Sequence, residues 1–278
     1  MVRIYPLAAS LVLALALALS SGCAPTGSSQ LKVATTTSLL GALAKEIGGE
    51  RVDVVTIIPP AACPGHFDTK PGDVKVLANA RLFLKHGWEG FADNLVKSAN
   101  NPALSVVQVQ VEGNWMVPET QAKAIDPVVD ALSKADPAGR DFYQQRGSAY
   151  KDKVLATGRR LRDTLAGRAA GVRVLCSQMQ VDFVKWAGFE VVDTFGRPEE
   201  TTPQKLQELV AKGRASRAAL VINNLQSDPD AGKGLAQEIG AVQLNLSNFP
   251  GAFEGTETWE KAVERNVDLL LEALDQRH

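Results

Sequence analysis

Short apolar runs alternate with stretches of helical periodicity along most of the chain. Strand-like runs lie at Leu31–Thr37, Val52–Ile58, Arg81–Lys85, Ser105–Val111, Val172–Cys176, Glu190–Phe195, Ala218–Ile222 and Val242–Leu246. Apolar residues three and four apart predict helices at Leu39–Ile47, Asp73–Ala80, Trp88–Val96, Val181–Ala187, Pro203–Lys212, Ala231–Ile239 and Trp259–Leu274. Strands that alternate with helices favour parallel sheets, so we predict an α/β fold with two lobes.

A stripe of large apolar residues predicts one long helix over residues 137–165. The stripe consists of Tyr143, Tyr150, Val154, Leu161 and Leu165, at spacings of 7, 4, 7 and 4 residues. At 1.5 Å per residue the helix would be about 40 Å long, enough to join the two lobes as one rod. Two shorter helices, broken at Gly147 or Gly158, are the alternative, because each glycine costs about 1 kcal/mol relative to alanine.

The first 22 residues differ from the rest of the chain. Arg3 is their only charge, and Leu11–Leu19 is an unbroken run of Leu, Val and Ala, as in a secretory leader. Small residues precede Cys23, as in a lipoprotein cleavage box, so we expect lipidation of Cys23. A retained membrane anchor is the alternative, although the run is shorter than the ~20 residues of a span.

These patterns divide the chain into five parts. We expect a signal peptide (1–22), a lipid-anchored tether (23–30), an N-terminal α/β lobe (31–136), a linking helix (137–166) and a C-terminal α/β lobe (167–278). The 30 basic and 31 acidic residues give no electrostatic footprint for nucleic acid. Beyond Cys23, only Cys63 and Cys176 remain, which is too few for a disulfide framework.

Two motifs carry a resemblance to a known family. His66-Phe67-Asp68-Thr69-Lys70-Pro71-Gly72-Asp73 is similar to a His-x-Tyr-Glu-x-x-Pro-x-Asp pattern, and Ala131-Leu132-Ser133-Lys134-Ala135-Asp136-Pro137 leads into the long helix. With the leader and the two lobes, the chain resembles the zinc/manganese-type solute-binding proteins of bacterial ABC importers. The resemblance implies a lipid-anchored, extracytoplasmic monomer that delivers a transition metal ion to an ABC permease and catalyses no reaction.

The same resemblance implies three histidine ligands and one carboxylate, most of which are missing here. His66 matches the first histidine. Gly113 stands where the second is expected, Ser177 stands at the third position beside Cys176, and Asn224 stands near the position of the carboxylate. One inherited ligand of the four is therefore kept.

The remaining thiols suggest a site with altered specificity. Cys63 lies three residues before His66, a spacing at which two ligands can converge on one ion, and Cys176 lies in the matching loop of the other lobe. We expect Cys63, His66 and Cys176 to bind a soft ion, with zinc favoured and copper, cobalt, nickel or manganese still open. Further expected cleft contacts are Ser177, Met179, Met116, Trp115, Asn223, Asn224, Gln226 and His86.

Other interpretations stay open at this stage. Cys63 and Cys176 can instead form one disulfide or pack as small apolar residues, and His66 can be a structural loop residue. The cargo can also be a metal chelate or a small organic ligand, held by uncharged side chains such as Asn224 and Gln226. An enzyme with a cysteine nucleophile and His66 as base is a third class, but the sequence lacks a Gly-x-Ser-x-Gly elbow, a His-Glu-x-x-His helix and a phosphate loop.

Overall fold

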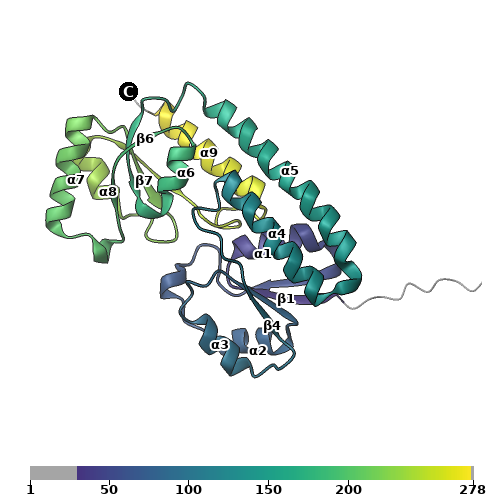
Figure 1. Cartoon of the computed structure of the whole chain (residues 1–278). Coiled ribbons are helices and arrows are strands. Elements are labelled where there is room, and N and C mark those ends of the chain that lie inside the picture. Colours follow the sequence, from purple (N-terminus) through teal and green to yellow (C-terminus); the bar gives the residue numbers. More distant parts are fainter. Residues whose placement is uncertain (1–29, 277–278) are drawn as a thin grey trace, which may run out of the picture.

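Two parallel four-stranded sheets organise the computed structural model, which describes residues 30–276 (Figure 1). The first sheet has the order β2-β1-β3-β4, with β1 (Leu31–Thr35), β2 (Val52–Thr56), β3 (Leu82–Lys85) and β4 (Ser105–Gln108). The second has the order β6-β5-β7-β8, with β5 (Arg173–Ser177), β6 (Glu190–Phe195), β7 (Leu220–Asn224) and β8 (Val242–Leu246). Every pair of neighbouring strands is parallel, which confirms the predicted fold class.

The α-helices surround these sheets. They are α1 (Ser38–Gly48), α2 (Pro71–Asn79), α3 (Ala92–Ala99), α4 (Pro118–Ala135), α5 (Arg140–Leu165), α6 (Val181–Trp186), α7 (Pro203–Ser216), α8 (Lys233–Ile239) and α9 (Trp259–Asp275). Within residues 30–276, none of the helices combines the length and the apolar character that a membrane span requires.

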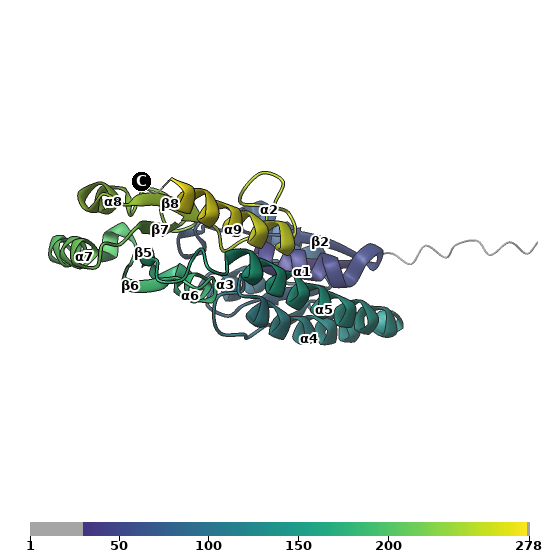
Figure 2. The ribbon, with the colours of Figure 1, turned by 90° about the horizontal axis from the view of Figure 1, so that it is seen from above.

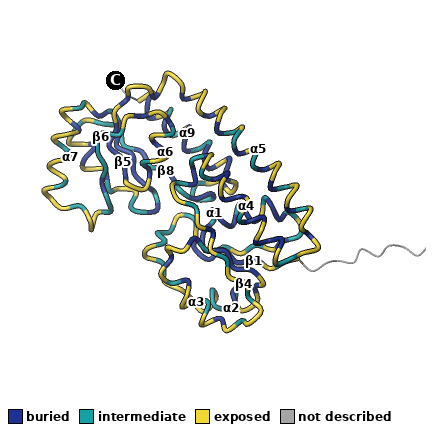
Figure 3. Tube along the Cα trace, viewed as in Figure 1, coloured by how far each residue is buried: buried dark blue, intermediate teal, exposed yellow. Residues whose placement is uncertain are grey.

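Three apolar clusters hold the layers together. One lies between the first sheet and the pair α2 and α3, and another between the second sheet and the pair α7 and α8. The third and largest spans both lobes and includes residues of α1, α4, α5 and α9. Figure 2 shows these four helices side by side, and Figure 3 shows buried residues running through them. The lobes therefore share one continuous core.

The long linking helix is continuous. A 3₁₀ turn at Pro137–Gly139 leads into α5, which passes through Gly147 and Gly158 without a break. A Cβ atom at Gly147 would collide with Val129, and one at Gly158 would collide with Pro118. The two glycines therefore do not break the helix; they let α4 pack closely against it.

The start of α3 differs from the sequence prediction. A helix from Trp88 was expected, but α3 begins at Ala92. The carboxylate of Glu89 accepts hydrogen bonds from the backbone N–H groups of His86 and Gly87, at 2.9 and 2.7 Å, and this holds the segment after β3 as a loop. Trp88 is therefore presented from a loop and is 56% exposed.

Two other local features also differ. Ser38, directly before the predicted helix Leu39–Ile47, was the expected cap, but Thr37 caps α1, because its hydroxyl accepts the N–H of Leu40. The helix α4 was not predicted, since Pro127 in its interior obscures the helical pattern. Pro118 at its first turn is favourable, because the N–H that proline lacks would have no partner within the helix.

Candidate functional site

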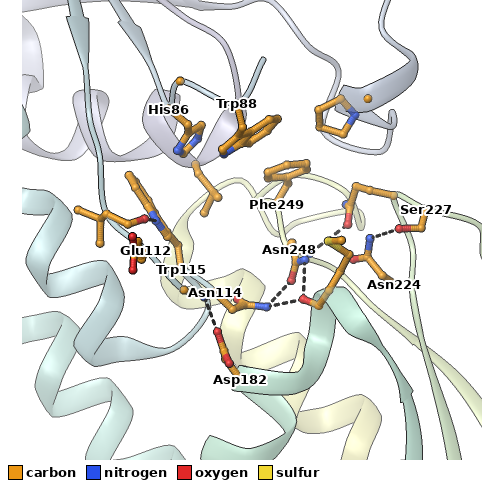
Figure 4. A pocket seen from close by; sticks show the side chains of 18 of the residues that line it. His86, Trp88, Glu112, Asn114, Trp115, Asp182, Asn224, Ser227, Asn248 and Phe249 are labelled. Carbon is orange, nitrogen blue, oxygen red and sulfur yellow. Dashed lines mark hydrogen bonds between the residues drawn. The ribbon is translucent and has the colours of Figure 1, made fainter. Parts of the chain in front are cut away.

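A cleft of about 790 Å³ lies between the two sheets (Figure 4). Its lining includes residues that follow the carboxyl ends of strands in both lobes, among them His86 after β3, Arg197 after β6 and Asn248 after β8. Ligands of open α/β sheets bind at this end of the strands. The cleft is therefore the candidate binding site.

Aromatic rings form the wall contributed by the first lobe. The ring of Trp88 stacks on His86 with centroids 5.1 Å apart and an interplanar angle of 15°. Trp115 meets His86 edge-on at 4.7 Å. Because Trp88 is more than half exposed while His86 and Trp115 are buried, Trp88 offers a free aromatic face to a ligand.

His86 is a neutral part of this wall. Its Nε2 atom lies 2.8 Å from the hydroxyl of Thr37. Burial lowers the pKa of His86 to about 4, and the nearby carboxylate of Glu89 only partly opposes this shift. The imidazole is therefore uncharged at neutral pH.

Uncharged amides form the wall contributed by the second lobe. Gln180 Nε2 donates to the amide oxygens of Asn224 and Asn248, at 2.9 and 3.0 Å. Gln226 donates to the hydroxyl of Ser247 at 2.8 Å and to the carbonyl of Pro60 in the first lobe at 3.0 Å. These bonds fix the orientation of the amides, which can donate to and accept from a ligand.

Asn114 joins this amide row from the segment that precedes α4. Its side-chain nitrogen donates to Asn248 Oδ1 at 2.8 Å and to the carbonyl of Met179 at 2.9 Å. Its backbone N–H donates to Asp182 Oδ2 at 3.1 Å. Asn114 therefore ties the floor of the cleft to the second lobe, as Figure 4 shows.

The structure does not bring the three predicted metal ligands together. Cys63 lines the cleft and is half-buried, whereas the side chain of His66 is 63% exposed, lies 3.6 Å from Glu199 and is not part of the cleft lining. Cys176 is fully buried in the shared core, and this burial raises its pKa to about 12. Residues 30–276 contain no group of three or more His, Cys, Asp or Glu side chains that could hold a metal ion.

The two cysteines are free thiols in the structure, so the disulfide considered from the sequence is not present between them. Cys176 lies on β5 and faces the core rather than the loop at the strand end. Its thiol therefore packs as a small apolar group, which was one of the alternatives considered from the sequence.

A one-residue difference in register explains why His66 lies outside the cleft. In the pattern that the sequence resembles, proline follows the histidine by six residues, whereas Pro71 follows His66 by five. Matching Pro71 places Gly65 at the histidine position. The structure agrees with this register, because Gly65 lines the cleft and His66 does not.

The other predicted contacts fall into two groups. Those that line the cleft are His86, Trp115, Met179, Asn224 and Gln226. Those buried outside the lining are Met116, Ser177 and Asn223. Sequence reasoning missed Asn114, Arg197, Asn248 and Phe249 as cleft residues. Asn248 could have been found, since it follows the carboxyl end of a predicted strand.

Comparison with known proteins identifies related chains. Residues 33–273 match the family model described as zinc-uptake complex component A, periplasmic. The metal ABC transporter substrate-binding lipoprotein FimA of Streptococcus parasanguinis is 22% identical, with 94% of each chain covered. The manganese-binding lipoprotein MntA of Halalkalibacterium halodurans is 23% identical, with 94% of this chain and 95% of MntA covered.

Solved structures show the same fold. The Mn-bound periplasmic metal binding protein from Candidatus Liberibacter asiaticus has a TM-score of 0.73 and 16% identity, covering 87% of this chain and 98% of that protein. The solute-binding protein FpvC of P. aeruginosa in complex with Ni²⁺ has a TM-score of 0.74 and 18% identity, covering 89% and 97%. At these identities the likeness establishes the fold alone.

Proposed function

Because the chain belongs to the family of periplasmic component A of zinc-uptake complexes, we propose that it is the substrate-binding component of a bacterial metal ABC importer. We further propose that its transition metal enters the cleft inside an organic chelator rather than as a bare ion. The family consists of solute-binding proteins, so the proposal includes no catalytic step.

The chemistry of the cleft lining carries the second part of this proposal. A protein that binds a bare transition metal ion places several thiolate, imidazole or carboxylate atoms within about 2–2.3 Å of it. Within residues 30–276, no cluster of three such side chains exists. The cleft volume of about 790 Å³ instead falls in the range of pockets that enclose a small organic molecule.

The walls suit an organic ligand that brings its own metal ligands. Trp88 offers a flat apolar face, and the amides of Asn224 and Asn248 each keep one N–H donor beyond their bonds to Ser227 and Met179. Neutral His86 adds no positive charge to the first wall. Selection of the metal would then depend mainly on the chelator, and recognition of the complex on the protein.

The expected location and partners follow from the same family. Relatives are named lipoproteins of metal ABC transporters, which supports attachment of lipid to Cys23 and delivery of the cargo to an ABC permease. Cys23 lies outside the described residues. We propose that the protein is an extracytoplasmic monomer that is anchored to the membrane surface.

The named relatives support a broader range of metals than zinc. Zinc was the favoured ion, but relatives are named for manganese, and similar structures hold Mn, Cd or Ni²⁺. These names support a transition metal as cargo and do not favour zinc. Capture of a bare ion through Cys63 and its neighbours remains the competing proposal that the next experiment tests.

Calorimetric titration of the purified lipoprotein separates the two cargoes. We expect free Zn²⁺, Mn²⁺ and Ni²⁺ to bind weakly, and preformed complexes such as Ni(II)–histidine or Fe(III)–citrate to bind more tightly. Replacing Trp88 with Ala should weaken binding of a complex about three- to tenfold, because a stacked aromatic face is lost. Tight stoichiometric binding of a free ion, unchanged by Trp88→Ala, would contradict the chelate proposal.

A further inference from the structure

We infer that Arg197 recognises an anionic group of the chelate, so that the cargo of this cleft is a negatively charged metal complex. This inference rests on the proposed function. It specifies the charge of the substrate and names the residue that binds the charged group.

Arg197 lies in the loop that follows β6 and lines the cleft in a half-buried position. Within residues 30–276 its guanidinium forms no ion pair, and the hydrogen bonds of this residue use its backbone N–H and carbonyl. The two nearby acids have other contacts. Glu199 lies beside His66, and Glu200 accepts the backbone N–H of Arg197 at 3.2 Å. The guanidinium donors are therefore available to a ligand in the cleft.

The missing side chain of Gly65 leaves the space that the Arg197 guanidinium occupies. A Cβ atom at residue 65 would lie 2.7 Å from Arg197 Nη2 and 3.2 Å from Nη1, so the guanidinium occupies the direction in which a side chain there would project. Pro71 places the first histidine of the resembled pattern at this same residue. A positive charge thus stands where a metal-binding side chain would reach into the cleft, and it repels a bare cation while attracting an anion.

The other charged groups of the cleft lie elsewhere. Glu112 and Asp182 flank Asn114 and Trp115 in Figure 4, whereas Arg197 lies against Gly65. An acidic group of the ligand is therefore drawn toward Gly65 and away from the Asn114 side. Arginine binds carboxylates through paired N–H donors, so a carboxylate-bearing chelate fits this end of the cleft.

A series of substitution-inert Co(III) complexes tests the inference, because such complexes do not exchange their ligands during the titration. The probes are the anionic EDTA complex, the neutral tris(glycinato) complex and the cationic tris(ethylenediamine) complex. We expect the wild-type lipoprotein to prefer them in that order by calorimetry, with quenching of tryptophan fluorescence through exposed Trp88. Arg197→Gln should lose about tenfold or more in affinity for the anionic complex, and Arg197→Lys should lose less.

Gly65→Ala provides a second test that does not alter any charge. The backbone at Gly65 is outside the left-handed region, and the atoms that a Cβ would meet are the movable end of Arg197, so the variant should fold. It should displace the guanidinium and weaken binding of the anionic complex. Combined with Arg197→Gln it should add little, since both changes act on one contact. Exposed Arg159→Gln and open Gly72→Ala are the matched controls.

The outcomes separate this inference from the proposed function. Equal affinity of wild type and Arg197→Gln for the anionic complex, or a preference for the cationic one, overturns the role of Arg197 while leaving a chelate cargo intact. Failure of the wild type to bind the anionic complex also overturns it. Tight binding of free Zn²⁺ or Mn²⁺, with no complex bound, overturns the proposed function itself.

Discussion

At the scale of single residues, burial determines which thiol is chemically available. Cys176 is fully buried, and burial raises its pKa to about 12, whereas Cys63 lies half-buried at the cleft. Because the thiolate is the nucleophile, we expect iodoacetamide to alkylate Cys63 in the native protein and to leave Cys176 unmodified. Peptide mass spectrometry measures both sites. Labelling of both cysteines after denaturation is the control, and equal labelling in the native state would contradict the structure.

Buried His86 should make stability depend on pH. Burial lowers its pKa to about 4 in the folded protein. As pH falls below about 6.5, the imidazole is therefore protonated in the unfolded chain while it stays neutral in the folded one. The free energy of unfolding should therefore fall between about pH 6.5 and 4, by at most roughly 3 kcal/mol from this residue.

Urea denaturation at a series of pH values checks the effect of His86. His86→Asn removes the titrating group and should flatten this part of the pH profile, whatever its effect on stability at pH 7. Glu89 contributes a loss of the same sign, because its pKa is lowered and its stabilisation disappears at still lower pH. A profile of the same slope in wild type and His86→Asn would count against a neutral, buried imidazole.

Some of the residues that line the cleft could be predicted from the sequence. His86, Trp115, Asn224 and Gln226 were expected in the cleft, His86 from its place after a strand and the other three from the resembled family pattern, and all four line it. His66 was placed wrongly relative to the cleft, because one residue of register decides which side chain of a turn faces the ligand.

Arg197 shows a second limit of the sequence. Its importance comes from contact with Gly65, more than a hundred residues earlier in the chain, and only the packing of the two lobes creates that contact. No local pattern around residue 197 distinguishes it from a solvent-exposed arginine.

At the scale of elements, the glycines of α5 serve packing. Gly147 and Gly158 lie against Val129 and Pro118 of α4, with no room for a methyl group. Alanine would raise helix propensity by about 1 kcal/mol but force α4 outward, at a cost of about 1–3 kcal/mol. We therefore expect Gly147→Ala and Gly158→Ala each to lower the midpoint of urea denaturation. Ala156→Gly, at an exposed position of the same helix, controls for propensity alone; stabilisation by both alanine substitutions would refute close packing.

Strong periodicity made most elements predictable, and tertiary contacts moved the boundaries. The run Glu190–Phe195 is β6 as predicted, and the stripe within residues 137–165 became α5. The start of α3 shifted because the Glu89 carboxylate binds the backbone N–H groups of His86 and Gly87 and holds the segment before Ala92 as a loop. A side chain that competes for the backbone in this way is not visible in a hydrophobic pattern.

At the scale of the whole molecule, the two lobes are joined by more than one helix. The largest apolar cluster includes residues of both lobes. Trp259 Nε1, at the start of α9, donates to the carbonyl of Trp115 at 2.7 Å, and Lys153 of α5 pairs with Glu260 of α9 at 2.9 Å. Across the cleft, Gln226 reaches the carbonyl of Pro60. A large opening motion would have to break into a buried core, and this disfavours hinge bending between lobes.

Binding should therefore change the overall shape very little. The helix α5 has 26 residues, about 39 Å at 1.5 Å per residue, and packs along α1, α4 and α9. We expect small-angle scattering of the lipoprotein, with and without a saturating anionic Co(III) complex, to give the same radius of gyration within error. Side-chain and loop adjustments around Trp88 and Arg197 should instead appear as altered tryptophan fluorescence without a change in size. A decrease in the radius of gyration on the scale of domain closure would show that the shared core yields, and that α5 does not hold the lobes at a fixed angle.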